Sequence, residues 1–145
     1  MSAGPHDTVL APYAQALGMF VDRIEHGVPV IAADFSDKVL GRPGFLHGGA
    51  IAGMLEMAGF AALQAHLAGR GMDVRLKPVN ISVEYLRGAG RARTFARGTV
   101  LRAGRRMANV RVEAWQADPD KPVASCWMNV LLAPRDPGQV APDRA

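Results

Sequence analysis

Residues 41–67 read GRPGFLHGGAIAGMLEMAGFAALQAHL, and this stretch decides how the rest of the chain must fold. It begins as a loop, because Gly41, Pro43 and Gly44 interrupt both the helical and the strand period. From residue 48 to residue 67 the side chains are apolar on nearly every side. A helix of this kind is surrounded by the rest of a globular protein. The stretch therefore predicts one long, buried helix.

The same segment is long enough to cross a bilayer, and Gly49 and Gly53 have the spacing found in pairs of membrane helices. Glu56 argues against insertion, because an acid near the middle of a spanning helix costs about 2.5–3.5 kcal/mol. The chain also starts without the charged-then-apolar pattern of a secretory signal peptide. We therefore expect a protein of the cytoplasm, without a membrane partner.

The whole chain has 145 residues, of which 49% are hydrophobic and 21% charged. At this length we expect one domain with its own core. The single cysteine, Cys126, excludes a disulfide framework within one chain and is expected to be a buried structural thiol. The domain is expected to cover residues 1–133, with a helical or strand lead-in over 13–25. A Pro-containing tail over 134–145 is expected to be disordered.

Charge is distributed unevenly along the chain. Residues 70–111 contain ten arginines and one lysine against Asp73 and Glu84, although the net charge of the chain is only +4. Such a basic block favours a nucleic acid or a phosphate-bearing small molecule as partner. Since neither an aromatic series nor a helix-turn-helix pattern accompanies the block, we expect no nucleic acid. Trp115 and Trp127 are expected to pack on strands.

Alternating apolar and polar residues predict strands on both sides of the helix. One is expected over 28–39. Beyond the helix, Val79 begins an apolar face that runs to Tyr85, and further strands are expected over 93–101, 109–114 and 123–132. The last four strands are typical of an antiparallel meander. One sheet cannot cover every side of an apolar helix. We therefore expect a partner subunit to cover the apolar surface that the sheet leaves.

Chemistry is expected where the loop meets the helix. Gly48 and Gly49 leave backbone N–H groups at the positive end of the helix dipole, which suits an anion or a developing oxyanion; two glycines would equally suit close packing. Glu56 is a carboxylate in an otherwise apolar helix. Such a group is costly to bury unless it is paired or has a task, so it is either a general base or a polar contact between subunits.

Helix geometry separates these two features. Eight residues of helix place Glu56 roughly 12 Å from Gly48, too far to act on one small group within one chain. An antiparallel partner helix would bring Glu56 of one subunit opposite Gly48 of the other. We therefore expect a homodimer whose active sites are shared between the subunits.

His47-Gly48-Gly49 with an acid nine residues after the histidine resembles the hotdog-fold acyl-CoA thioesterases. The resemblance is to the PaaI-like branch of the superfamily that also contains the 4-hydroxybenzoyl-CoA thioesterases. It covers about residues 28–133 and continues through the segments VEYLR (83–87), VLRAGRR (100–106) and VASC (123–126).

This resemblance implies an α+β hotdog fold, in which an antiparallel β-sheet wraps around one long central α-helix. It also implies that the sheets of two subunits pair in a dimer and that dimers often associate into homotetramers. The implied activity is hydrolysis of an acyl-CoA or aroyl-CoA thioester to free acid and CoA. No metal and no cofactor is implied, because CoA is part of the substrate.

By the same resemblance, Glu56 serves as general base or nucleophile, and the amide of Gly48 polarises the thioester carbonyl. His47 would help to orient the thioester or the attacking water. The CoA portion would bind near Gly49 and at the basic turns after the strands, where the candidate residues are Arg87, Arg105 and Arg106.

The chain departs from the family pattern in two ways. Relatives often have Asn six residues before the histidine, where this chain has Gly41, and the acid of the PaaI-like branch is usually Asp. Neither Met57 nor Phe60 offers the hydroxyl that can assist the acid in relatives. Two alternatives stay open: another hotdog acyl-thioester enzyme, such as a hydratase or dehydratase, and a non-catalytic acyl-CoA-binding protein.

Overall fold

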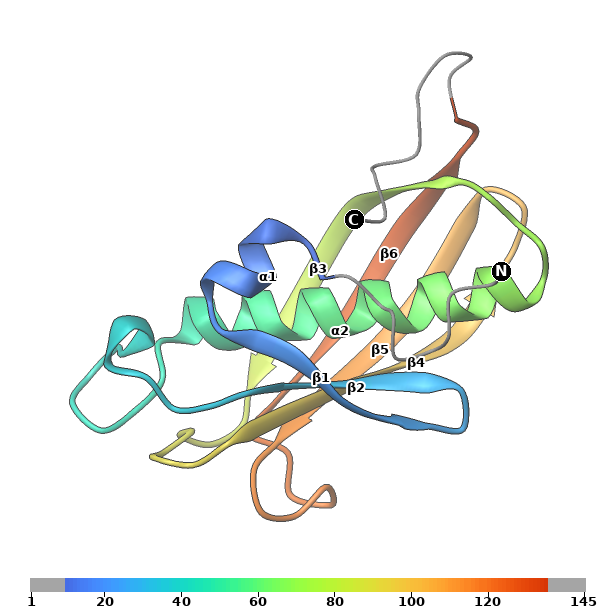
Figure 1. The fold of residues 1–145 in the computed structure, drawn as a ribbon. Helices are drawn as coiled ribbons and strands as arrows, with labels where there is room; N and C mark the ends of the chain where they lie inside the picture. Colours follow the sequence, from blue (N-terminus) through green and yellow to red (C-terminus); the bar gives the residue numbers. More distant parts are fainter. Residues whose placement is uncertain (1–9, 136–145) are drawn as a thin grey trace.

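A six-stranded antiparallel sheet curves around one long helix in the computed structural model, which describes residues 10–135 (Figure 1). This is the hotdog fold that the resemblance implied. The elements in chain order are α1 (Pro12–Ala16), β1 (Met19–Glu25), β2 (Val28–Ala33), a 3-10 turn (Asp37–Val39), α2 (Gly48–Gly69), β3 (Arg75–Tyr85), β4 (Thr94–Ala103), β5 (Met107–Trp115) and β6 (Ala124–Ala133).

The strands follow the order β1-β2-β4-β5-β6-β3, which differs from the predicted meander. β4, β5 and β6 do pair in sequence order, but β3 lies at the edge of the sheet against β6, from Arg75 opposite Ala133 to Tyr85 opposite Ala124. β4 pairs instead with β2. The segment 88–90 is therefore a crossing from one edge of the sheet to its middle and not a hairpin turn. Alternation identifies a strand and its faces, but it does not identify the neighbour of that strand.

Two strand predictions were wrong in their details. β2 ends at Ala33 and not at residue 39, because Ser36 accepts a hydrogen bond from the Lys38 N–H and starts the 3-10 turn. In β3 the register shifts between Pro78 and Asn80, since the extra residue of a bulge is left unpaired. Val79 is consequently 59% exposed and does not share the inner face with the rest of β3.

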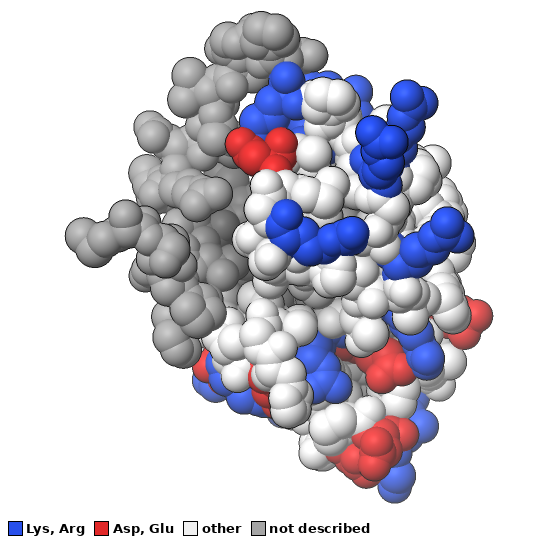
Figure 2. All heavy atoms as spheres, turned by 90° about the vertical axis from the view of Figure 1, so that its right-hand side faces the viewer, with Lys and Arg blue, Asp and Glu red and all other residues white. Residues whose placement is uncertain are grey.

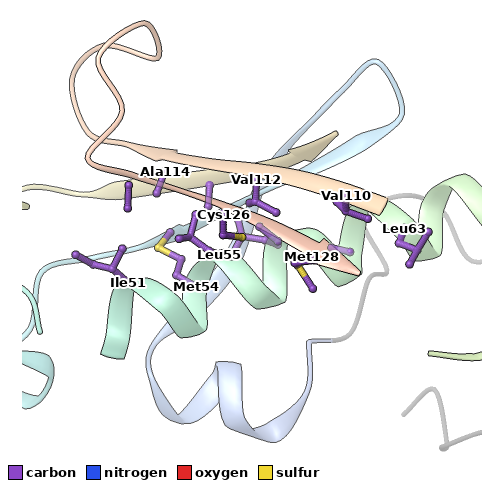
Figure 3. Close-up of a cluster of buried hydrophobic side chains, with 14 of the residues drawn as sticks. Ile51, Met54, Leu55, Leu63, Val110, Val112, Ala114, Cys126 and Met128 are labelled. Carbon is purple, nitrogen blue, oxygen red and sulfur yellow. The ribbon is translucent and has the colours of Figure 1, made fainter. Parts of the chain in front are cut away.

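The core lies between α2 and the inner face of the sheet (Figure 3). Cys126 belongs to it, as predicted, and is fully buried. Gly98 of β4 permits the closest approach, because a Cβ there would lie 2.8 Å from the Ala62 Cβ and 3.1 Å from the Ala58 carbonyl oxygen of α2. The remaining fully buried large side chains include Leu55, Leu63, Val110, Val112 and Met128.

α1 covers the side of α2 that faces away from the sheet (Figures 1 and 3). Tyr13 crosses α2 at Gly53, where a Cβ would lie 3.1 Å from its ring. By length and composition α2 could span a membrane, but 56% of its most apolar window is buried inside the fold. Of the tail predicted over 134–145, residues 136–145 lie outside the described residues, and Arg135 forms a salt bridge of 2.7 Å with Asp73.

Candidate active site

His47 caps the N-terminus of α2. Its backbone is extended, and its Nδ1 accepts a hydrogen bond of 2.8 Å from the Gly49 N–H. Its carbonyl oxygen accepts hydrogen bonds from the N–H groups of Ala50 and Ile51, at 3.0 and 3.2 Å. Capping of this kind satisfies the N–H groups that a helix leaves without partners in its first turn. The sequence did not predict it, because His is uncommon at this position.

Of the N–H groups in the first turn of α2, that of Gly48 is the one His47 does not bind. Among residues 10–135, no acceptor bonds to it. It lies at the first position of α2, a helix of 22 residues, where the helix dipole favours negative charge. Gly48 is partly exposed and Gly49 is exposed, so a ligand can reach this backbone. The arrangement suits a carbonyl oxygen that develops negative charge.

Tyr85, at the end of β3, lies directly over this glycine. Its hydroxyl donates a hydrogen bond of 3.0 Å to the Gly48 carbonyl oxygen. A Cβ at residue 48 would lie 3.3 Å from the Tyr85 ring, so the ring packs closely because residue 48 is glycine. Tyr85 is nonetheless 56% exposed and borders the open side of the helix terminus. Strand alternation predicted only that Tyr85 shares a face with Ile81 and Val83.

The loop before α2 folds back on itself and on the segment after β3. Leu40 and Leu46 form a β-bridge, and the Leu46 N–H donates to the Ala89 carbonyl oxygen. A Cβ at Gly41 would lie 3.1 Å from the Cα of His47, so the asparagine of relatives has no room here unless this backbone shifts. Arg42 stacks on Phe45 at 4.1 Å. No sequence pattern marks Arg42 as a site residue, although it precedes α2 by only a few residues.

Glu56 is half-buried on α2 and forms no hydrogen bond or ion pair with any residue of the described range. Its negative charge nevertheless affects the pKa of a buried thiol in the core. Burial raises the pKa of the Cys126 thiol to about 11, and the negative charge of Glu56 adds to that increase. Cys126 pairs with Val83 of β3 across the sheet. These relations place Glu56 on the part of α2 that overlies β6, next to the β3 edge.

Within one subunit the structure does not bring Glu56 and Gly48 together. They lie on the same straight helix, about 12 Å apart along its axis. Two cavities lie elsewhere: one of about 130 Å³ on the outer face of the sheet beside Arg97, and a groove of about 790 Å³ lined by the β1–β2 turn, β4 and the C-terminal half of α2. Neither is lined by His47 or Glu56.

The candidate CoA-binding arginines fall into two places. Arg87 follows β3 beside the start of α2, and its backbone N–H donates to the Val123 carbonyl oxygen. Arg105 and Arg106 lie in the β4–β5 turn, near the other end of α2, where Arg70 donates to the Ala103 carbonyl oxygen. Since α2 is about 33 Å long, these arginines cannot line one groove within a single subunit. Figure 2 faces the end that carries the β4–β5 turn and shows Lys and Arg side chains spread over it.

Three arginines of the basic block form ion pairs with acids around the outer face of the sheet. Arg93 pairs with Asp34 at 2.7 Å, Arg97 with Glu25, and Arg111 with Glu113 at 2.7 Å. All three guanidinium groups also lie over aromatic rings, those of Phe20, Trp115 and Trp127. Both tryptophans thus pack on strands. Arg87, Arg105 and Arg106, by contrast, have no ion-pair partner among residues 10–135.

No group of three or more His, Cys, Asp or Glu residues within the described chain could hold a metal ion. The candidate site therefore consists of a helix-terminal amide, a carboxylate on the same helix and free arginines at both ends of the fold.

A family model of the thioesterase superfamily matches residues 43–123, which is more than half of the chain. The chain belongs to the thioesterase superfamily. Membership supports thioester hydrolysis in general as its activity.

Solved structures of similar fold agree with this assignment. A mutant of the phenylacetic acid degradation protein PaaI from Thermus thermophilus is 28% identical over 84% of this chain and 99% of that chain, with a TM-score of 0.71. A protein from Chromobacterium violaceum is 31% identical over 84% of this chain and 83% of that chain, with a TM-score of 0.68. A mutant thioesterase from Staphylococcus aureus, at 20% identity over 86% of this chain and 100% of that chain, shares the fold with a TM-score of 0.71. No curated protein sequence matches the chain.

Proposed function

We propose that this thioesterase-superfamily protein hydrolyses an acyl-CoA or aroyl-CoA thioester to free acid and CoA in the cytoplasm. The observation that carries the proposal is the N-terminus of α2, where His47 satisfies the Gly49, Ala50 and Ile51 N–H groups and leaves that of Gly48 open. An open backbone donor at a helix N-terminus suits the oxyanion of a thioester under attack.

Glu56 is the proposed base. It is the only acid on α2, and no residue of the described range forms a hydrogen bond or ion pair with it. It would take a proton from water as the water oxygen attacks the carbonyl carbon, while Gly48 stabilises the oxyanion. The tetrahedral intermediate then expels the CoA thiolate, which receives the proton and leaves as CoA. Direct attack by the Glu56 carboxylate, giving an anhydride that water opens, is the nucleophilic variant of the same reaction.

The two groups would meet across a homodimer formed through β3. β3 pairs with β6 on one side only, so its other edge is available to a second copy. Antiparallel pairing of two β3 strands joins the sheets and makes the two α2 helices antiparallel. Glu56 of one subunit then lies opposite Gly48 of the partner subunit, which completes two equivalent sites. Association of two such dimers into a homotetramer is the further assembly we propose.

The same pairing supports the assignment of the arginines. Leu76, in the first half of β3, lies opposite Leu132, and the Leu132 N–H donates to the Arg106 carbonyl oxygen. Tyr85, at the other end of β3, contacts Gly48. Antiparallel pairing therefore sets the β4–β5 turn of each subunit, with Arg105 and Arg106, beside the Gly48 end of the partner subunit. Arginines placed in this way suit the CoA phosphates.

The test is thiol release from short, medium, long and aromatic acyl-CoAs. We expect wild type to turn over at least one class and Glu56→Gln, which keeps the shape but loses the charge, to reduce kcat by at least about 10²-fold. Glu113→Gln is the matched control, because Glu113 lies on β5, on the outer face of the sheet, away from α2 and from the β3 edge. Equal activity of wild type and Glu56→Gln would remove Glu56 from the mechanism. Binding of acyl-CoA without release of thiol from any of them would favour a binding protein or a hydratase instead.

A further inference from the structure

The peptide group between Gly48 and Gly49 is held by a side chain at each end. Its N–H donates to His47 Nδ1 at 2.8 Å, and its carbonyl oxygen accepts from the Tyr85 hydroxyl at 3.0 Å. The two side chains come from different parts of the fold, because His47 is next to Gly48 in the chain and Tyr85 lies 37 residues after Gly48. Together they fix the plane of this peptide.

The preceding peptide, between His47 and Gly48, is fixed as well. Its carbonyl oxygen accepts hydrogen bonds from Ala50 and Ile51 at 3.0 and 3.2 Å. Its N–H is the open donor of Gly48. Glycine is the residue with the greatest backbone freedom, so Gly48 alone would not hold this N–H in one direction. With the peptides on both sides bonded, the direction of the donor is set before a substrate arrives.

We propose that Tyr85 and His47 are positioning residues that clamp the Gly48–Gly49 peptide and thereby aim the Gly48 N–H at the thioester carbonyl oxygen. This inference rests on the proposed function. The benefit lies in preorganisation, since a donor that needs no rearrangement stabilises the transition state more than one that must first be ordered. Tyr85 acts through its hydroxyl, while its ring packs closely on Gly48, where a Cβ would lie 3.3 Å from the ring.

The clamp also gives His47 a defined task. Its Nδ1 is occupied as an acceptor, so capping is the role that the structure itself contains. Orientation of the thioester or of water, which the family resemblance implied, could involve only the other ring nitrogen. The two roles make different predictions for substitutions, because a cap requires only an acceptor at this place, whereas orientation through Nε2 requires the imidazole.

The first test removes the Tyr85 hydroxyl and keeps its ring. We expect Tyr85→Phe to lower kcat by about 5- to 30-fold, less than loss of an oxyanion donor itself, with KM changed by less than about 2-fold. Tyr13→Phe is the matched control, because Tyr13 is a second exposed tyrosine that packs on a glycine of α2, at Gly53. It should match wild type. An unchanged kcat in Tyr85→Phe would overturn the role of Tyr85.

The second test separates capping from imidazole chemistry at His47. We expect His47→Ala to lower kcat by about 10-fold or more and His47→Asn, whose side chain is also a good cap, to recover most of the loss. The capping role would be wrong if His47→Asn lost as much kcat as His47→Ala while both variants kept the melting temperature of wild type. The imidazole itself would then be needed.

A third readout follows the clamp directly, by exchange of the Gly49 amide hydrogen in protein labelled with ¹⁵N-glycine. The clamp predicts slow exchange in wild type, faster exchange in His47→Ala and Tyr85→Phe, and no change in Tyr13→Phe. Fast exchange in wild type would contradict the clamp whatever the kinetics. A wild type that releases no thiol would overturn the proposed function and the role of the clamp together, whereas an active wild type with an unaffected Tyr85→Phe would overturn the inference alone.

Discussion

Cys126 lies on the inner face of β6, where its thiol is fully buried and is influenced by the negative charge of Glu56. Both burial and this negative charge disfavour the thiolate, and they raise its pKa from 9.0 to about 11. The unfolded chain releases this proton at lower pH than the folded chain does. Stability from this group is therefore complete below about pH 9 and decreases as the pH rises towards 11.

We predict that the free energy of unfolding of wild type falls by about 1 kcal/mol more than that of Cys126→Ala between pH 8 and pH 10. Urea denaturation at several pH values measures this difference. The cavity left by alanine lowers stability at every pH and so does not affect the slope. All other ionisable side chains are common to the two proteins. Parallel pH profiles would show that the thiol is not the responsible group.

At the residue scale, local sequence patterns led to the candidate groups, whereas the contacts of these groups depend on the fold. Gly48 and Glu56 could be recognised because a glycine pair at a helix start and a lone acid in an apolar helix are local patterns. The hydrogen bond of Tyr85 to Gly48 could not be predicted, because it depends on where β3 ends along β6 and on how α2 crosses the sheet. The cap by His47 is local, but only the rotamer of the histidine reveals it.

At the scale of elements, the contact between β4 and α2 depends on Gly98. A Cβ there would lie 2.8 Å from the Ala62 Cβ, 3.1 Å from the Ala58 carbonyl oxygen and 3.2 Å from the Gly59 Cα. Two of these three atoms belong to helix backbone and cannot rotate away. The added methyl group can be accommodated only if β4 and α2 move apart, which loosens the core on both sides.

We predict that Gly98→Ala destabilises the protein by about 1–3 kcal/mol, which lowers the melting temperature by several degrees. Gly90→Ala is the matched control, since nothing lies within 4 Å of a Cβ at that position. Thermal unfolding followed by circular dichroism compares the two variants. Equal melting temperatures would mean that α2 can shift away from the sheet at no cost.

The strands themselves were predicted from alternation, but their order was not. Residues 79–85 and 93–101 follow each other in the sequence with glycines between them, so the sequence alone favours a hairpin. The structure places β3 next to β6 and β4 next to β2. Which strands become neighbours depends on which apolar faces cover α2, and this is decided only in the assembled sheet. The bulge at Val79 likewise reflects the pairing of β3 with β6.

At the scale of the whole molecule, one subunit holds both proposed catalytic groups but keeps them about 12 Å apart on one helix. In the proposed mechanism, a second copy that pairs through the β3 edge would bring its Glu56 to the Gly48 N–H. The sequence led to the same proposal through helix geometry. Light scattering after gel filtration should give a mass of at least two chains. A fully active monomer would contradict shared sites.

Complementation between two inactive variants tests the shared sites directly. Glu56→Ala removes the base. Gly48→Pro removes the N–H at the first position of α2, where proline is tolerated, while Gly48→Ala adds a Cβ at the same place but keeps the N–H and so controls for contact with Tyr85.

Random mixing of the Glu56→Ala and Gly48→Pro chains makes half of the dimers heterodimers, and each of these has one complete site if the base and the amide come from different subunits. Thiol release should then recover to about a quarter of the wild-type rate, far above that of either variant alone. If both groups acted within one chain, no mixture could contain an intact site. The mixed sample would stay at the mean of the two inactive variants, and the dimer would be a matter of stability and not of catalysis.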